Sequence, residues 1–166
     1  MAAPAPKLAD RFSQTHSKQS LRLWLSILNC STVIEKEIRS FLAREFDTTL
    51  PRFDVLAALD RYSDGLSMGE LSGHLLVSNG NVTGLVARLQ EDGLVERNVS
   101  PVDRRTFRVR LTDAGRRSFV KMAAAHEAFV DALLSDLGDR EIADLLTRLH
   151  RIQDRLDAKL AREEDA

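Results

Sequence analysis

The side chains best suited to chemistry in this sequence are those that hydrogen-bond to nucleic acid. Arginine pairs with guanine or with phosphate, asparagine pairs with adenine, and threonine can contact the methyl group of thymine. Such residues gather in two stretches, 78–92 and 97–110. The second stretch holds five arginines and a single acid, Asp103, so its local charge is +4. Because local charge density decides contact with phosphates, the two stretches together indicate DNA binding.

The first stretch has the spacing of a short amphipathic helix. Its inward residues are expected to be Val82, Leu85, Val86 and Leu89, opposite a bare side led by Gly80, Gly84 and Ala87. A glycine inside a helix costs about 0.5–1 kcal/mol relative to alanine, so two of them on one exposed side need a reason. Close approach to a major groove is one reason, and a merely tolerant surface is the other. The DNA contacts expected from this region are Ser78, Asn79, Gly80, Asn81, Thr83, Gly84 and Arg88.

The second stretch lies in two strand-like runs around a polar, proline-marked loop, which together predict a β-hairpin. On the later run Phe107, Val109 and Leu111 face one side, and Arg108 and Arg110 face the other. A hairpin of this kind can hold a cation clear of the protein body. We therefore expect Asp103 to orient Arg105 toward the minor groove and Arg104 to contact phosphate. Arginines that are simply solvated are the competing interpretation.

Helices that would position both stretches are predicted by caps and periodicity. Ser67 and Glu70 form a capping box that starts a short helix to about Leu76, and Ser78 caps the next helix, which stops at Gly93. This order, two short helices and then a hairpin, is that of a winged helix-turn-helix. Upstream, Pro51 begins a helix that continues to Gly65.

Long helices are predicted at both ends of the chain, over about 20–46, 113–137 and from Gly138-Asp139 onward. Their apolar stripes are broader than one small domain can cover, which favours a second subunit as partner. The predicted fold class is mainly α with a small β-hairpin wing, a winged helix-turn-helix flanked by long dimerisation helices. The expected segments are a flexible N-terminal arm (1–18), an N-terminal dimerisation helix (19–48), the winged helix-turn-helix lobe (49–111) and C-terminal dimerisation helices (112–166).

Composition narrows the class of protein. With 24 basic and 25 acidic residues the net charge is −1, so only the local charge favours DNA. Cys30 is the single cysteine, no signal peptide or membrane-length apolar run is recognisable, and a cytoplasmic location is expected. His16, His74, His126 and His150 are scattered, so we expect no metal and no cofactor. Without a phosphate loop, a G-x-S-x-G motif or a convincing carboxylate pair, we do not expect an enzyme.

The segment LSMGELSGHLLVSNGNVTGLVARLQEDGLVERNVSPVDRRTFRVRLTDAGR resembles the DNA-binding lobe of the MarR family of bacterial regulators. The D-R-R wing pattern appears as Asp103-Arg104-Arg105, and the L-T-x-x-G pattern runs from Leu111 to Gly115. The resemblance implies a homodimer on a pseudo-palindromic DNA operator, usually a repressor that a small ligand releases by filling a cleft beside the lobe. Asn79-Gly80 departs from the bulkier residues of many members and leaves the operator sequence open.

A narrower similarity links LRLWLSILNCSTVIEKEIR and TTLPRFDVLAALDR to members that regulate the catabolism of aromatic acids. It implies a small aromatic acid or an aryl-CoA thioester as effector. Trp24, Ser31, Arg52 and Phe53 would then supply aromatic walls, a hydroxyl and a cation. For each of them an ordinary core or surface role is the alternative.

Two other functions are compatible with the same elements. A winged helix can bind a protein instead of DNA, although the paired wing arginines then have little use. Cys30 could also make the protein a redox-sensing regulator, but it lies within an apolar stripe and has no neighbouring cation, which favours a buried, inert thiol.

Overall fold

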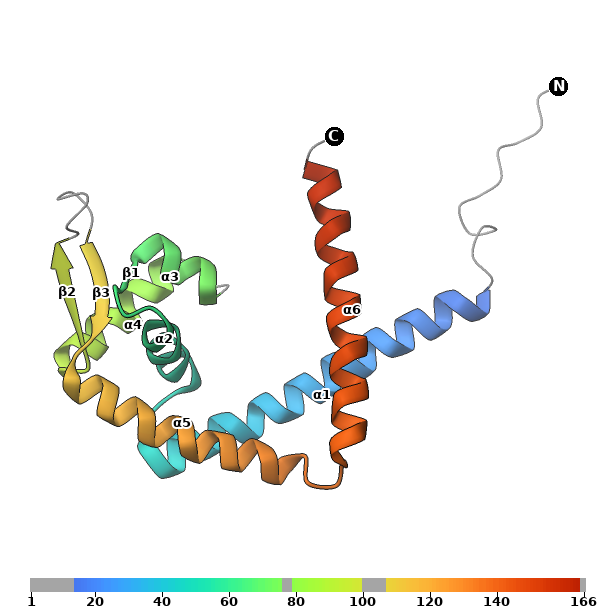
Figure 1. Ribbon diagram of the computed structural model, residues 1–166, viewed down its shortest axis with the longest axis horizontal. Coiled ribbons are helices and arrows are strands. Elements are labelled where there is room, and N and C mark those ends of the chain that lie inside the picture. Colours follow the sequence, from blue (N-terminus) through green and yellow to red (C-terminus); the bar gives the residue numbers. More distant parts are fainter. Residues whose placement is uncertain (1–13, 76–78, 100–106, 165–166) are drawn as a thin grey trace. The chain divides into compact units, whose positions relative to one another are not determined.

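The protein is described here by a computed structural model, which covers residues 14–75, 79–99 and 107–164 (Figure 1). It is mainly helical with one small antiparallel sheet, so the predicted fold class is confirmed. In chain order the elements are α1 (Gln14–Phe46), α2 (Leu50–Arg61), β1 (Leu66–Ser67), α3 (Met68–Leu75), α4 (Asn79–Glu91), β2 (Val95–Val99), β3 (Phe107–Leu111), α5 (Asp113–Leu133) and α6 (Asp139–Glu164). The chain divides into two compact units, Met1–His126 and Glu127–Ala166.

Three helix boundaries differ from the sequence prediction. Helix α1 begins at Gln14 instead of Ser20, because the polar residues between them include no proline or glycine to stop it. Helix α2 ends at Arg61, before Gly65, which takes a left-handed backbone with φ of 76°. Helix α5 ends at Leu133, because the chain tightens into a turn in which the Leu137 amide donates to the Leu134 carbonyl. The predicted arm of residues 1–18 lies mostly outside the described residues.

The core of the first unit forms where α2, α3 and α4 meet the sheet. Its largest fully buried side chains include Leu56, Leu59, Leu71, Val82, Val86, Leu89 and Val109. Burying a side chain of this size stabilises the fold by about 1.5–3 kcal/mol. The inward face predicted for α4 is correct at three of its four positions, whereas Leu85 is half-buried. That fourth side chain borders an open cavity described below.

The sheet has the order β1-β3-β2, and both pairs are antiparallel. In the hairpin, Val95 pairs with Leu111 at the base and Val99 pairs with Phe107 at the outer end. We call β2, β3 and residues 100–106 between them the wing. Phe107 is 55% exposed although it was predicted to share the inner face with Val109 and Leu111, because the core ends before the outer end of the wing.

Two glycines allow backbone segments of the winged helix-turn-helix lobe to pack closely against each other. A side chain at Gly65 would place its Cβ 2.5 Å from the carbonyl oxygen of Val109, and a side chain at Gly115 would place it 1.9 Å from the carbonyl oxygen of Leu94. Both positions therefore require a residue without a Cβ. Thr112 caps α5, since its hydroxyl accepts from the Gly115 amide at 3.0 Å.

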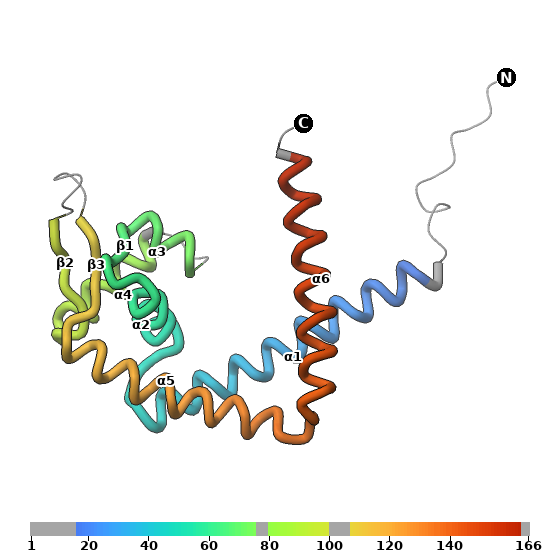
Figure 2. Tube along the Cα trace, in the orientation of Figure 1, coloured from blue at the N-terminus to red at the C-terminus, as the bar shows by residue number. Residues whose placement is uncertain are grey.

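The second unit, Glu127–Ala166, contains the end of α5, a turn and α6. Figure 2 traces α6 as one uninterrupted helix. The Gly138 amide donates to the Glu141 carboxylate at 3.0 Å in the turn before α6. A stripe of large apolar side chains remains exposed on α6, namely Leu145, Leu149, Ile152, Leu156 and Leu160. Across residues 14–75, 79–99 and 107–164, we find no helix with the length and apolarity to cross a membrane.

Candidate nucleic-acid interface

The outer surface of α4 is almost free of side-chain bulk. Val82, Val86 and Leu89 bury the inner face of the helix completely, which turns Gly80 and Gly84 outward. Among the described residues, no atom of another element lies within 4 Å of the Cβ that either glycine lacks, so packing there does not require them. A helix with such a surface can approach another molecule closely.

The start of α3 is held by the predicted capping box. The Ser67 amide donates to the Glu70 carboxylate at 2.7 Å, and the Glu70 amide donates to the Ser67 hydroxyl at 3.2 Å. The backbone amide of Ser67, and after it the Ser67 side chain, hydrogen-bond to the Glu70 carboxylate and lower the pKa of Glu70. The cap therefore fixes where α3 begins relative to the strand β1 before it.

Several of the residues predicted to contact DNA are exposed together on α4. They are Gly80, Asn81, Thr83, Gly84 and Arg88. Arg88 has no ion-pair partner among the described residues, which leaves its charge available to an anion. Ser78, the side chain of Asn79, and Asp103, Arg104 and Arg105 lie outside the described residues.

The arginines of the wing are less available to a nucleic acid than a local charge of +4 suggests. Arg97 is exposed on β2, and Arg110 lies 3.9 Å from the carboxylate of Glu96, a residue just outside the stretch used for that count. Arg108 is half-buried, and its guanidinium donates to backbone carbonyls near the start of α3. Alternation along the strand predicts the side on which Arg108 lies, but it does not reveal these hydrogen bonds.

A cavity of about 560 Å³ lies beside α4, within the first unit. Its apolar lining residues are Leu50, Pro51, Leu75 and Leu85, and its charged ones are Glu35, Arg39, Asp54 and Arg88. Gly80, Asn81 and Gly84 also line it, so the cavity adjoins the candidate DNA surface directly. The cavity therefore combines apolar surface with charged groups of both signs.

The charged groups around this cavity differ in their availability. Arg39 donates through Nε to Glu35 at 2.9 Å, in an ion pair along one turn of α1. Burial raises the pKa of Asp54, and the nearby Arg39 cation opposes that shift. Arg88 is the lining cation without a carboxylate partner among the described residues. The cavity is thus suited to a molecule with an apolar body and one anionic group.

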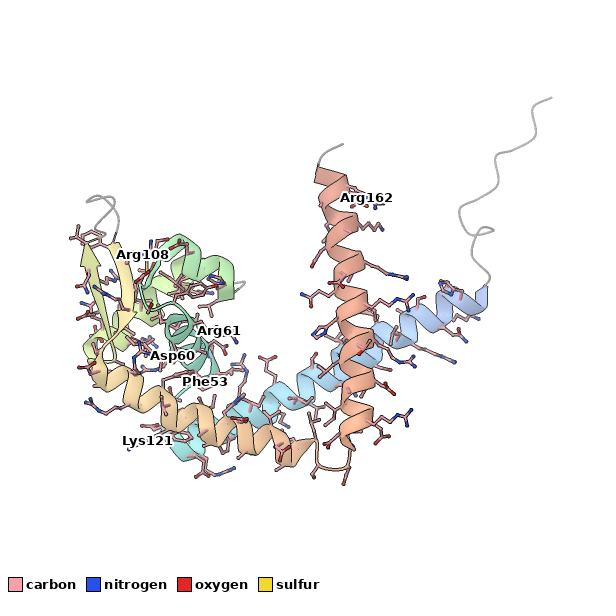
Figure 3. The ribbon with its side chains drawn as sticks, viewed as in Figure 1. Phe53, Asp60, Arg61, Arg108, Lys121 and Arg162 are labelled. Carbon is pink, nitrogen blue, oxygen red and sulfur yellow. The ribbon has the colours of Figure 1, made fainter. Side chains whose placement is uncertain are left out.

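The four residues predicted to bind an effector do not line this cavity. Trp24 is 56% exposed on α1, and the Ser31 hydroxyl donates to the Leu28 carbonyl one turn earlier. Arg52 forms an ion pair with Asp92, which ties the first turn of α2 to the end of α4. Phe53 is buried with its ring centroid 4.9 Å from that of His126 and 5.6 Å from that of Phe119; Figure 3 labels Phe53 on α2. Their role with an effector stays a prediction.

Other candidate sites show no constellation of reactive groups. Cys30 is exposed on α1, so its predicted burial is wrong for the single chain, since the neighbouring apolar residues Leu28 and Val33 are exposed as well. His74 stacks on Tyr62 with ring centroids 4.9 Å apart, and burial lowers the pKa of His126 beside Phe53. In the part of the chain that the structure describes, histidine, cysteine and carboxylate side chains form no group of three suited to a metal ion.

Two short helices followed by an antiparallel hairpin define the winged helix-turn-helix class of DNA-binding proteins. A model of the MarR family matches residues 46–106. The transcriptional activatory protein BadR of Rhodopseudomonas palustris is 30% identical over 159 residues, which are 94% of this chain and 90% of BadR. The chain belongs to the MarR family of transcriptional regulators.

Solved structures agree with this assignment. The crystal structure of a MarR family transcriptional regulator from Silicibacter pomeroyi has a TM-score of 0.74 and 37% sequence identity, and the match covers 87% of this chain and 99% of that one. The S. aureus MepR–DNA complex has a TM-score of 0.65 and 19% identity, and the match covers 88% and 98% of the two chains. The similarity to MepR supports the fold alone.

Proposed function

We propose that this protein is a homodimeric, ligand-responsive repressor that binds a pseudo-palindromic DNA operator. The observation that carries the proposal is the glycine-lined outer surface of α4 next to an arginine-bearing wing. In this arrangement α4 enters the major groove, where a helix fits and where each base pair presents a distinct pattern of donors and acceptors.

The exposed residues of α4 divide into two roles in this proposal. Asn81 and Thr83 read base edges, since asparagine bonds adenine in a bidentate manner and threonine contacts the thymine methyl. Arg88, one helical turn after Gly84, contacts a phosphate or a guanine. On the wing, Arg105 enters the minor groove, Arg104 contacts phosphate and Asp103 orients Arg105.

Exposed apolar surface on the long helices supports the homodimer. On α1, Leu21, Leu25 and Leu28 are between 45% and 57% exposed, and the stripe on α6 is similarly open. Apolar surface of this extent on a soluble chain normally marks an interface. A symmetric dimer would present two α4 helices to successive major grooves about 34 Å apart, which is why a pseudo-palindromic operator is expected.

The cavity beside α4 supports an effector that combines an aromatic body with an anionic group, such as an aromatic acid or its CoA thioester. The apolar residues would hold the body of the molecule, and Arg88 would pair with its anionic group. Because Arg88 also belongs to the DNA surface, a bound effector would withdraw that cation from DNA. Its binding would favour the DNA-free state by at most the difference between its affinities for the two states.

The experiment is a fluorescence-anisotropy titration on DNA from the upstream region of the protein's own gene, with and without p-coumaroyl-CoA. We expect tight binding at moderate salt that the thioester abolishes. Tight binding whose affinity is unchanged by p-coumaroyl-CoA, by free aromatic acids and by oxidants would contradict ligand responsiveness. Equal affinity for this DNA and a scrambled sequence would contradict operator binding and favour a protein partner instead.

Repression is tested separately, because the similar BadR is a transcriptional activatory protein. A reporter fused to the same upstream region should be expressed more strongly when the gene for this protein is deleted. Lower expression in the deletion strain would show that the protein is an activator, and the proposal that it binds an operator would still hold.

A further inference from the structure

Arg108 occupies a position from which it touches three parts of the lobe. It lies on β3, where it pairs in register with Ser67 of β1 on one side and Asn98 of β2 on the other. Figure 3 labels this side chain on the hairpin side of the lobe, next to α3. Its side chain is only 30% exposed although a strand arginine in a DNA-binding wing is expected to be open to solvent.

The guanidinium of Arg108 is bound mainly by backbone oxygen atoms. Its Nη2 donates to the Gly65 carbonyl at 2.8 Å, and its Nε donates to the carbonyls of Asp64 and Gly65, both at 3.2 Å. The same Nη2 lies 3.5 Å from the carboxylate of Glu70, the residue that caps α3. One planar fork therefore connects the turn after α2, the cap of α3 and β3, the middle strand of the sheet.

The backbone alone connects these parts weakly. Strand β1 is only two residues long, and it is the strand that joins β3 to the start of α3. The turn before it closes through one hydrogen bond, from the Gly65 amide to the Tyr62 carbonyl at 2.8 Å. Additional hydrogen bonds from Arg108 at this junction would limit how the wing can tilt relative to the helix-turn-helix.

We propose that Arg108 is a positioning residue for DNA binding, which fixes the wing to the helix-turn-helix so that Arg104, Arg105 and α4 meet DNA at one spacing. The inference rests on the proposed function, because it presumes that the wing contacts DNA. Arg108 acts here through backbone carbonyls and Glu70 and does not itself contact DNA. Fixing the spacing in advance removes an ordering cost from binding.

The first test replaces Arg108 by lysine, which keeps the charge but cannot bond two carbonyls and a carboxylate in one plane. We expect Arg108→Lys to weaken operator binding roughly tenfold, the size of one charge-assisted hydrogen bond. Arg110→Lys is the matched control, since Arg110 lies on the same strand, is 45% exposed and should tolerate the change. Unchanged affinity for Arg108→Lys, with thermal unfolding like that of the unsubstituted protein, would overturn the proposal.

A double-mutant cycle with Arg105→Ala separates positioning from a general loss of stability. If Arg108 positions the wing, Arg105→Ala should cost much less affinity in the Arg108→Lys background than in the unsubstituted protein. Full additivity of the two losses would overturn the role of Arg108 and leave the proposed function intact. An Arg105→Ala protein that binds as tightly as the unsubstituted one would instead overturn the wing contact, and this inference with it.

Glu70→Gln provides a test that does not depend on any change at Arg108. Glutamine can still form the capping box but loses the charge that faces Arg108. Removal of a negative charge alone should strengthen binding to DNA, whereas loss of positioning should weaken it. Operator affinity that rises in Glu70→Gln would contradict the proposal.

Discussion

Gly80 and Gly84 add no side chain to the exposed side of α4, and no other described part of the chain crowds the Cβ position of either. Alanine at such a position should favour the helix, because alanine is the better helix former by about 0.8–1 kcal/mol. The absence of alanine there is therefore not explained by folding. The proposed contact with DNA would explain it, because even a methyl group would hold the helix away from the groove.

We predict that Gly84→Ala raises the thermal unfolding midpoint and weakens operator binding at the same time. Gly73→Ala in α3 is the control, since its Cβ position is equally open and the substitution should stabilise the protein without the loss of affinity. Thermal unfolding and anisotropy on the same preparations provide both values. A Gly84→Ala protein with unchanged operator affinity would contradict the groove assignment.

Asn81→Ala should change which operator variants bind best and should leave non-specific affinity nearly unchanged. A bidentate contact to adenine discriminates between bases by about 1–3 kcal/mol, so that preference is what the variant should lose. Titration against single-base variants of the operator measures it. Equal losses on operator and scrambled DNA would make Asn81 a backbone contact.

The burial of a residue could be predicted from the sequence where a local pattern determines it. The burial of Val82, Val86 and Leu89 follows from helical periodicity alone. The partners of Arg52 and Arg108 lie 40 and 43 or 44 residues away, and no local pattern encodes such pairs. The lining of the cavity was missed for the same reason, because it is assembled from four separate helices.

At the scale of elements, the start of α3 depends on the reciprocal bonds of Ser67 and Glu70. This signal is contained in four consecutive residues, so the sequence predicts it correctly. Strand β1 could not be predicted in the same way, because two residues carry no alternation and become a strand only by pairing with β3. The predicted ends of α2 and α5 are too late, since the first glycine after α2 is Gly65, and the apolar spacing of α5 continues through Leu134 and Leu137 past its last turn.

The capping box gives the stability of the protein a specific dependence on pH. The pKa of Glu70 is lowered on folding, so its contribution is complete above the ordinary glutamate pKa. It is lost as the pH falls through that value toward the lowered pKa of the folded state, because the unfolded chain takes up the proton first. We predict that Glu70→Gln has a shallower acid loss of stability than the unsubstituted protein. Urea unfolding between pH 6 and pH 3 measures both curves, and parallel curves would contradict the prediction.

At the scale of the whole molecule, α1 and α6 each carry large apolar side chains that are exposed in the part of the chain that the structure describes. We predict that Leu149→Glu on the α6 stripe produces a monomer. Operator binding should then fall by orders of magnitude, because each half-site is bound by a separate monomer. Ala158→Glu is the matched control, since residue 158 lies roughly opposite the stripe on the same helix. Light scattering coupled to size exclusion gives the mass, and a Leu149→Glu protein of dimeric mass would contradict the assigned interface.

The most direct test of a symmetric operator-binding dimer is a hydroxyl-radical footprint of the protein on its operator. A dimer that inserts two α4 helices and two wings should protect a two-fold symmetric pattern whose centres lie about one helical turn, 10–10.5 base pairs, apart. Arg105→Ala should remove the protections in the flanking minor grooves and leave the central ones. A single asymmetric protected patch, or no protection at saturating protein, would contradict the central claim of a symmetric operator-binding dimer.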